Sequence, residues 1–249
     1  MLSDQEFLRY SRQLLLEDIG PEGQEKLKSA SVLLVGLGGL GAPASMYLAA
    51  AGVGTLLLAD DDRLHLTNLQ RQILYRTADV DKPKAELAQR QLQALNPNAE
   101  IVALTERLGG EALYQAVNRA DVVLDCSDNM ETRHTVNAAC VHAGKPLISG
   151  SAVGFSGQLL VLTPPYHQGC YACLYPDAAE PRRNCRTAGV LGPVVGVIGT
   201  LQALEAIKLL AGLPSPLSGK LRLFDGKQQS WNTLQLTRAA HCPVCGEPA

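Results

Sequence analysis

One stretch decides the fold, Val32-Leu-Leu-Val-Gly36-Leu-Gly38-Gly39-Leu-Gly41. Its apolar beginning predicts a buried strand, and the glycines that follow predict a turn that opens a helix. In such a turn the first glycine allows the tight bend, the second lets the backbone approach a phosphate, and the last permits close packing of helix on strand. Amide groups at the start of the helix would face the anion. The predicted nucleotide-binding residues of the turn are Gly36, Gly38, Gly39 and Gly41.

A second apolar run, 55–59, ends at an acid. An acid about 20 residues after a glycine turn of this kind hydrogen-bonds the ribose hydroxyls of the nucleotide, so Asp60 is the predicted ribose ligand. Its neighbours Asp61 and Asp62 are interpreted as solvated loop charges. The turn and the acid do not identify which nucleotide binds, because nicotinamide and flavin sites have the same two features.

Strand-like and helix-like segments alternate after the glycine turn. Strands are expected at 55–59, 100–104 and 121–125, and helices at about 39–51, 82–95, 110–118 and 130–143. Continuous runs such as Val122-Val-Leu124 are typical of strands covered on both faces. Later strands are expected at 147–151, 158–163, 220–224 and 230–236, with a helix at 193–211 and a hairpin about Asp225-Gly226. The predicted fold class is α/β, a Rossmann-like, mostly parallel doubly wound sheet extended by C-terminal antiparallel strands.

The chain of 249 residues is expected to form a single domain over 1–249. Residues 1–30 are predicted to be an N-terminal helical segment, because Ser3 and Glu6 have capping-box spacing ahead of apolar residues at helical intervals. Residues 31–150 would form the nucleotide-binding half. Residues 151–249 would form the second half, which contains a long loop rich in proline, glycine and cysteine over 164–187.

Composition and charge exclude several classes of protein. The net charge is −2 and charged residues make up 18% of the chain, so no basic field is present to gather nucleic acid. The acidic N-terminus lacks the basic-then-apolar order of a secretory signal, which favours a cytoplasmic protein. Two stretches without charge, 31–59 and 187–204, carry glycine and proline and are interpreted as buried core, not as membrane spans.

A polar, cationic segment follows the predicted ribose ligand. It reads Asn68-Leu-Gln-Arg71-Gln72, and Lys84 comes a dozen residues later. An arginine fork and a lysine point charge suit a triphosphate whose negative charge must be neutralised as pyrophosphate leaves. The segment therefore favours ATP over a dinucleotide. The alternative is a solvated loop followed by an ordinary helix-face lysine.

The predicted strand at 121–125 ends in Asp125-Cys-Ser-Asp128-Asn129. Open α/β sheets bind their ligands at this carboxyl edge, so Asp128 and Asn129 are predicted to face the nucleotide. One carboxylate together with phosphate oxygens suffices for Mg²⁺, which makes Asp128 the candidate magnesium ligand. The alternative is that Asp128 caps the helix beginning near Met130.

Seven cysteines without an export signal point to metal binding or thiol chemistry. Four of them form two Cys-x-x-Cys pairs separated by 68 residues (174–241), namely Cys170, Cys173, Cys242 and Cys245. Four thiolates suit tetrahedral Zn²⁺ with no open position, so the predicted zinc site is structural and ties the C-terminal tail to the long loop. The alternatives are two local redox pairs or unrelated buried thiols.

The other three cysteines divide into two kinds. Cys126 and Cys140 lie in apolar contexts and are interpreted as core. Cys185 lies in Arg182-Arg-Asn-Cys185-Arg186, where the nearby cations favour a nucleophilic thiolate. Local sequence leaves open whether it is a reactive thiol or an incidental loop cysteine.

Taken together, these motifs resemble the ThiF/MoeB/HesA family, bacterial relatives of the ubiquitin-activating enzymes. The resemblance covers nearly the whole chain. It rests on Arg9-Tyr-Ser-Arg12-Gln13, the glycine turn, the segment 68–72, Lys84, the segment 125–129 and both Cys-x-x-Cys pairs. Three further stretches, 151–155, 184–190 and 192–196, look more like ThiF members than MoeB members.

The resemblance implies an activity and a set of partners. ThiF members adenylate the C-terminal glycine of the ubiquitin-like sulfur carrier ThiS with ATP, releasing pyrophosphate, for sulfur transfer to the thiazole of thiamine. MoeB members act likewise on the molybdopterin carrier MoaD, which is the alternative substrate. A persulfide donor such as a cysteine desulfurase would supply the sulfur. A nicotinamide oxidoreductase is a distant third possibility, and a non-catalytic, zinc-stabilised binding module is disfavoured because the motif residues are intact.

The resemblance also implies roles for particular residues. Asp60 would hold the ribose, and Asp128 would bind Mg²⁺. The triphosphate would be bound by Asn68, Arg71 and Lys84. Arg12 would reach into the nucleotide site of the partner subunit in a homodimer, and Cys185 would form a sulfur-linked adduct with the carrier terminus. The second half of the chain, 151–249, would bind the carrier.

Overall fold

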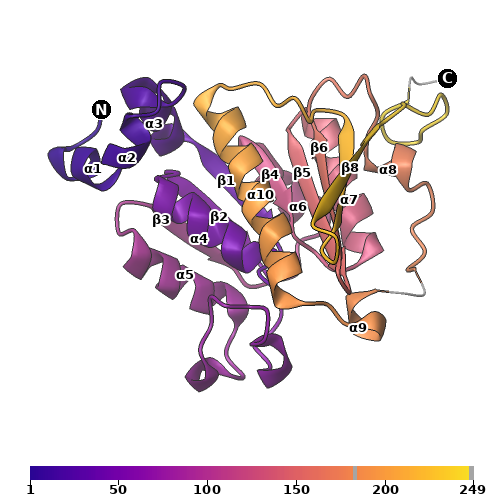
Figure 1. Cartoon of the computed structure of the whole chain (residues 1–249), viewed down its shortest axis with the longest axis horizontal. Helices are drawn as coiled ribbons and strands as arrows, with labels where there is room; N and C mark the ends of the chain where they lie inside the picture. Colours follow the sequence, from indigo (N-terminus) through magenta and orange to yellow (C-terminus); the bar gives the residue numbers. More distant parts are fainter. Residues whose placement is uncertain (182–183, 247–249) are drawn as a thin grey trace.

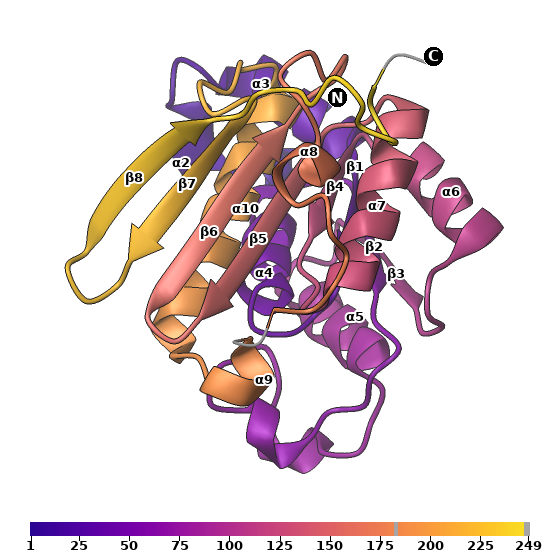
Figure 2. The ribbon, with the colours of Figure 1, turned by 90° about the vertical axis from the view of Figure 1, so that its right-hand side faces the viewer.

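The computed structural model describes residues 1–181 and 184–246, and its centre is one eight-stranded sheet (Figures 1 and 2). The strand order is β3-β2-β1-β4-β5-β6-β7-β8. The strands are β1 (Ser31–Val35), β2 (Thr55–Ala59), β3 (Glu100–Leu104), β4 (Val122–Asp125), β5 (Leu147–Val153), β6 (Ser156–Leu162), β7 (Lys220–Asp225) and β8 (Ser230–Gln235). The first five in this order are parallel and the last three are antiparallel. The predicted α/β fold is confirmed.

Helices cover both faces of the sheet. They are α1 (Asp4–Arg9), α2 (Ser11–Leu14), α3 (Gly20–Ser29), α4 (Gly41–Ala51), α5 (Lys84–Leu95), α6 (Gly110–Arg119), α7 (Met130–Ala143), α8 (Tyr171–Leu174), α9 (Cys185–Ala188) and α10 (Gly192–Ala211), with short 3-10 turns η1 (Leu66–Asn68) and η2 (Thr77–Asp79). Figure 1 shows α4, α5 and α10 in front of the sheet and α6 and α7 behind it. This is the doubly wound arrangement that continuous apolar strands require.

Strand β1 shows why the apolar run predicts burial on both sides. Val32 and Leu34 belong to the core shared with α4, α5 and α10. Leu33 and Val35 belong to the core shared with α6 and α7. Because successive side chains of a strand point to opposite faces, a strand covered on both faces needs apolar residues at every position.

The N-terminal segment consists of three helices and not one. The capping box predicted from Ser3 and Glu6 is present, and it starts the short helix α1. Helix α3 packs against α10, so the segment lies beside one end of that helix (Figure 1).

Helix α10 has the length and apolar composition of a membrane span, and it is the one such helix in the described part of the chain. It packs against α4 and against strands β5 and β6. These contacts bury half of its most apolar window. The apolar stretch 31–59 forms β1, α4 and β2 of the core.

Two predicted segments differ in detail. The loop expected over 164–187 contains the single-turn helices α8 and α9. The C-terminal hairpin has a four-residue loop at 226–229, in which Gln229 has a positive φ of 50°. The Asp225-Gly226 signal marked the beginning of this loop, because Asp225 accepts the amide of Lys227 at 2.9 Å.

Candidate nucleotide site

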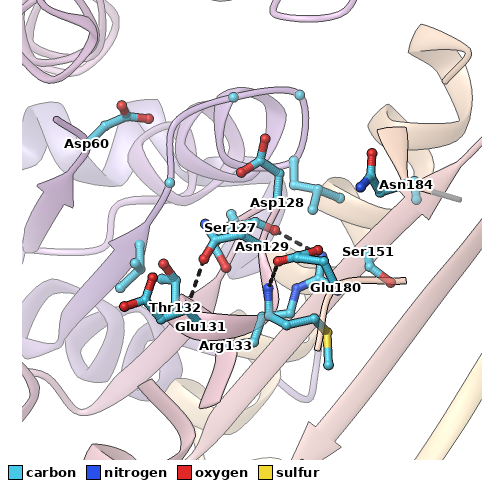
Figure 3. A pocket seen from close by; sticks show the side chains of 18 of the residues that line it. Asp60, Ser127, Asp128, Asn129, Glu131, Thr132, Arg133, Ser151, Glu180 and Asn184 are labelled. Carbon is cyan, nitrogen blue, oxygen red and sulfur yellow. Dashed lines mark hydrogen bonds between the residues drawn. The ribbon is translucent and has the colours of Figure 1, made fainter. Parts of the chain in front are cut away.

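A pocket of about 820 Å³ lies at the carboxyl edge of the parallel strands, over the glycine turn. Its lining includes most of the residues predicted to bind a nucleotide: Gly36, Gly38, Gly39, Asp60, Arg71, Gln72, Lys84, Asp128 and Asn129. Figure 3 shows part of the pocket, with Asp60, Asp128, Arg133 and Glu180 among the side chains that line it. The topology therefore gathers side chains from five separate segments.

The glycine turn has no room for side chains at two positions. Gly36 has a φ of +95°, and a Cβ there would lie 2.7 Å from the carbonyl oxygen of Cys126. A Cβ at Gly41 would lie 2.0 Å from the carbonyl oxygen of Gly36. The turn thus packs on the segment after β4, and α4 begins directly on the turn. This close approach is the reason that the sequence must be glycine at both positions.

Asp60 has a structural contact that the sequence did not predict. Its Oδ2 accepts the backbone N–H of Leu37 at 2.7 Å, and its Oδ1 accepts that of Asp62 at 2.9 Å. Burial raises the pKa of Asp60, although the charge of Lys84 and these two hydrogen bonds act in the opposite direction. The predicted ribose ligand therefore also holds the turn in place.

Lys84 begins α5 and is almost entirely buried. Its Nζ lies 3.3 Å from Oδ2 of Asp62. Asp62 is exposed, as expected of a loop charge, and its carboxylate is in addition the partner of a buried ammonium. The side chain of Asp62 is 72% exposed, so another anion could take its place as the partner of Lys84.

Within the segment 68–72, one predicted site residue stabilises the local fold and the others line the pocket. Asn68 lies outside the described lining of the pocket, and its Oδ1 accepts the backbone N–H of His65, which closes the η1 turn. Arg71 lines the pocket and donates from Nη1 to the carbonyl of Thr67. Gln72 is buried, and its Oε1 has no hydrogen-bond partner in the described part of the chain. An unpaired buried amide oxygen is costly, so this atom fits a pocket that receives a donor from a ligand.

The segment after β4 presents Asp128 to the pocket, exposed to solvent. The alternative interpretation of Asp128 as a helix cap was wrong, because Asn129 is the N-cap of α7 and accepts the backbone N–H of Thr132 at 2.9 Å. Asn129 therefore lines the pocket while its side-chain oxygen caps the helix. Asp128 precedes the cap residue, and its carboxylate lines the pocket (Figure 3).

Three residues of this site were missed in the sequence. Asp125 is fully buried and accepts the backbone N–H and the hydroxyl of Ser127. Arg133 donates to the carbonyl of Ser127, and Glu180 accepts the backbone N–H of Met130 at the start of α7. Burial raises the pKa of Asp125, and the charge of Arg133 opposes that rise. The sequence feature that could have revealed Asp125 is its position as an acid at the end of an otherwise apolar strand.

The four cysteines of the two Cys-x-x-Cys pairs form one cluster. All four sulfur atoms lie within 4.8 Å of one another. The Sγ atoms of Cys170 and Cys242 are 3.7 Å apart, and those of Cys173 and Cys245 are 3.4 Å apart. Because these contacts join the two pairs, local redox pairing within each Cys-x-x-Cys is disfavoured. The cluster has the composition and closeness to hold a metal ion. Cys126 and Cys140 are buried core thiols, as predicted.

Two further predicted site residues are not among the described residues that line the pocket. Arg12 is exposed on α2, and the described lining of the pocket does not include it. Cys185 begins α9, but its side chain lies outside the part that the structure describes. Their predicted roles depend on a second subunit and on a carrier protein, respectively.

The fold and the pocket define a nucleotide-binding α/β protein with cationic side chains at its glycine turn and a four-cysteine cluster. The chain belongs to the ThiF family, whose sequence profile matches residues 10–244.

Individual relatives cover almost the whole chain. A protein of Escherichia coli (strain K12) named sulfur carrier protein ThiS adenylyltransferase is 64% identical over 245 residues, which are 98% of this chain and 97% of that protein. The molybdopterin-synthase adenylyltransferase of the same organism is 46% identical over 246 residues, 99% of each chain. Among solved structures, E. coli MccB with ATP is similar with a TM-score of 0.81 and 27% identity, covering 96% of this chain and 73% of that one.

Proposed function

We propose that this chain transfers AMP from ATP to the C-terminal glycine carboxylate of a ThiS-type ubiquitin-like sulfur carrier and releases pyrophosphate. The observation that carries the proposal is the meeting of Arg71, Lys84 and Asp128 with the glycine turn in one pocket. Membership in the ThiF family and the name of the 64% identical relative support the same activity. The function would serve sulfur transfer in thiamine thiazole biosynthesis.

Each part of the pocket has a proposed role toward ATP. Asp60 would accept hydrogen bonds from the ribose hydroxyls, and the glycine turn would receive phosphate oxygens. Arg71 and Lys84 would neutralise the triphosphate, with Asn68 shaping the turn that carries Arg71. The orphaned Oε1 of Gln72 would accept a ligand donor. Because Lys84 is already paired with an exposed carboxylate, a phosphate would replace Asp62 as its partner.

The chemistry follows from the distribution of charge. An oxygen of the carrier carboxylate would form a bond to the α-phosphorus while the bond from that phosphorus to pyrophosphate breaks. The product is a carboxyl adenylate on the carrier. The nucleophile is already ionised near neutral pH, so the site needs no strong base. Its task is to stabilise negative charge that develops on the phosphoryl and pyrophosphate oxygens.

Two metals fit the residues present. The carboxylate of Asp128 at the pocket, together with phosphate oxygens, suits Mg²⁺, which would neutralise phosphate charge. The four-sulfur cluster suits Zn²⁺, because tetrahedral thiolate ligands about 2.3 Å from the ion lie about 3.8 Å from one another. This separation is close to the sulfur distances of 3.7 and 3.4 Å. With four thiolates and no open position, the zinc would be structural.

The assembly around the site is also proposed. In a homodimer, Arg12 of one subunit would complete the nucleotide site of the other. Residues 151–249 would bind the carrier, within the single domain 1–249 whose nucleotide-binding half is 31–150. A mixed dimer tests the first point, because a subunit with Arg12→Ala should recover activity beside a subunit with Asp128→Ala.

Sulfur transfer would follow in the cytoplasm. A persulfide sulfur from a donor such as a cysteine desulfurase would attack the acyl carbon of the adenylate and displace AMP. The Cys185 thiolate would then attack the carrier-side sulfur of the resulting acyl disulfide, break its S–S bond and release the donor's thiolate, which leaves an acyl disulfide between the carrier terminus and Cys185. Replacement of Cys185 by serine should leave formation of the adenylate intact, because that step precedes the thiol chemistry.

One experiment tests the activity directly. The purified chain is incubated with ATP, Mg²⁺ and either a ThiS-type or a MoaD-type carrier, and the mass of each carrier is measured along with exchange of pyrophosphate into ATP. We expect AMP on the ThiS-type carrier. Modification of the MoaD-type carrier alone would favour the second candidate, which the 46% identical molybdopterin-synthase relative supports. Binding of NADH without binding of ATP would overturn both.

A further inference from the structure

Asp125, which is buried, and Arg133 of α7 both hydrogen-bond to Ser127 in the segment that carries Asp128. We propose that Arg133, together with Asp125, is a positioning residue that fixes this segment so that Asp128 meets the divalent cation of the nucleotide. The inference rests on the proposed function, since it assigns a cation to Asp128. It gives a role to two charged residues that the described chemistry leaves unused.

Asp125 clamps the start of the segment. One oxygen of its carboxylate accepts the backbone N–H of Ser127 at 3.0 Å and the hydroxyl of Ser127 at 2.6 Å. The other oxygen accepts the hydroxyl of Ser149 on the neighbouring strand β5 at 3.1 Å. Gln202 of α10 donates to the backbone carbonyl of Asp125 at 2.8 Å. The clamp is thereby tied to both the sheet and a core helix.

Arg133 holds the same residue from the opposite side. Its Nη2 donates to the backbone carbonyl of Ser127 at 3.0 Å, reaching back toward the start of α7 as helical side chains do (Figure 3). Burial alone would lower the pKa of Arg133, but the charge of Asp125 raises it above the usual value, and Glu180 adds to the rise. The positive charge of Arg133 is therefore favoured by both carboxylates. The N–H and the C=O of Ser127 are each held by one member of the Asp125 and Arg133 pair.

Asp128 lies between two fixed neighbours. Ser127 precedes it, and Asn129 follows it with its side chain committed to the cap of α7. Mg²⁺ demands near-ideal octahedral geometry, and a displacement of about 1 Å at a reacting site costs about 10²-fold. Loss of Arg133 would free the carbonyl of Ser127 and let the carboxylate of Asp128 drift. Replacement of Arg133 should therefore weaken cation binding by displacing Asp128.

The test measures cation binding separately from catalysis. Mn²⁺ is titrated into the full-length protein with a non-hydrolysable ATP analogue and followed by electron paramagnetic resonance. We expect Arg133→Met to weaken Mn²⁺ binding about tenfold, Arg133→Lys to weaken it less, and the affinity for the analogue without metal to stay within about twofold. Arg119→Met, at an exposed arginine of α6 outside the pocket, is the matched control and should change neither quantity. Thermal unfolding checks that each variant is folded.

A double-mutant cycle decides whether Arg133 acts through Asp128. Asp128→Asn alone should weaken Mn²⁺ binding, and adding Arg133→Met to it should weaken it no further. An equal tenfold loss in both backgrounds, or no loss from Arg133→Met in the native background, would overturn the inference. If Asp128→Asn leaves Mn²⁺ binding unchanged, the proposed cation role of Asp128 fails instead. Should Arg133→Met not fold, Ser149→Ala removes one contact of the clamp and should show a smaller shift in the same direction.

Discussion

Asp60 and Leu37 are joined across the glycine turn, because Oδ2 of Asp60 accepts the backbone N–H of Leu37 at 2.7 Å. The carbonyl of Leu37 accepts the hydroxyl of Tyr75, also at 2.7 Å. Both polar groups of one turn residue are therefore held by side chains from other segments. The acid proposed to bind ribose also sets the shape of the glycine turn.

Replacement of Asp60 should weaken ATP binding and stability together. We expect Asp60→Ala to weaken ATP binding about 10²-fold and to lower the free energy of unfolding by about 1.5–3 kcal/mol, the range for a hydrogen bond to a charged group. Asp121→Asn is the matched control, since Asp121 also accepts a backbone N–H, that of Ser31 at 2.8 Å, far from the pocket. Calorimetric titration with ATP and urea unfolding check both values. Unchanged ATP affinity in Asp60→Ala would show that Asp60 does not bind the nucleotide.

Two glycines with positive φ should respond differently to alanine. At Gly36 the new Cβ would meet the carbonyl of Cys126 at 2.7 Å, so Gly36→Ala should displace the turn and abolish ATP binding. Gly144, with a φ of +62°, has nothing within 4 Å of the added atom, so Gly144→Ala should cost only about 1 kcal/mol and leave ATP binding intact. Thermal unfolding and ATP titration of the pair measure the difference. Equal losses would show that backbone strain, and not the close contact, governs this turn.

Lys84 should matter more for catalysis than for folding. Its ion-pair partner Asp62 is largely exposed, and Asp60, whose carboxylate also interacts with the Lys84 charge, keeps its two backbone hydrogen bonds, so Lys84→Met should stay folded. We expect exchange of pyrophosphate into ATP to fall by about 10²-fold or more. Lys82→Met, which breaks an ion pair with Asp79 beyond the pocket, is the control and should keep the exchange rate. A normal rate in Lys84→Met would contradict the proposed phosphate contact.

The free energy of unfolding should depend on pH through the titration of Asp125. Its pKa in the folded protein lies above the ordinary value of 3.8, so its contribution to stability is fully present below that value and is lost as the pH rises through the folded pKa. The free energy of unfolding of the native chain minus that of Asp125→Asn should therefore decrease as the pH rises from about 4. Urea titrations of both proteins across the acid range measure it. A difference that grows with pH would mean that Arg133 lowers this pKa more than burial raises it.

Removal of the proposed zinc should lower thermal stability without directly impairing the adenylation reaction. A strong chelator, or Cys245→Ser, should release about one zinc per chain and lower Tm by about 10 °C, which corresponds to several kcal/mol for a chain of this size. Cys140→Ala, at a core thiol outside the cluster, should retain the metal. Metal analysis and calorimetry give both readouts. Equal Tm values with and without metal would leave the cluster with no structural role.

The sequence predicted what depends on local pattern. Alternation of apolar runs and helical periods located the strands and long helices to within a few residues, and the glycine turn located the pocket. Spacing also found the four cysteines, because each pair is local and only their meeting is distant. The four-cysteine cluster and the carboxyl edge of the sheet were therefore predictable.

Contacts between distant segments were not predictable in the same way. The pairing of Lys84 with Asp62 spans 22 residues, and the contact of Glu180 with the start of α7 spans 50. Two adjacent polar residues after β4 also left the helix cap ambiguous, because Asp128 and Asn129 are both good caps. Which of them takes the cap depends on where the backbone turns helical. Asp125 was overlooked because its partners come from β5, α7 and α10.

A metal ion in the four-sulfur cluster would give the chain a closed topology. Once a metal joins Cys170 and Cys173 to Cys242 and Cys245, everything between them, including α10 and the last hairpin, becomes a ring. Closing a ring of this size removes freedom from the unfolded chain worth about 4 kcal/mol. In the folded protein, a single protease cut inside the ring would leave both fragments linked through the metal until a chelator removed it.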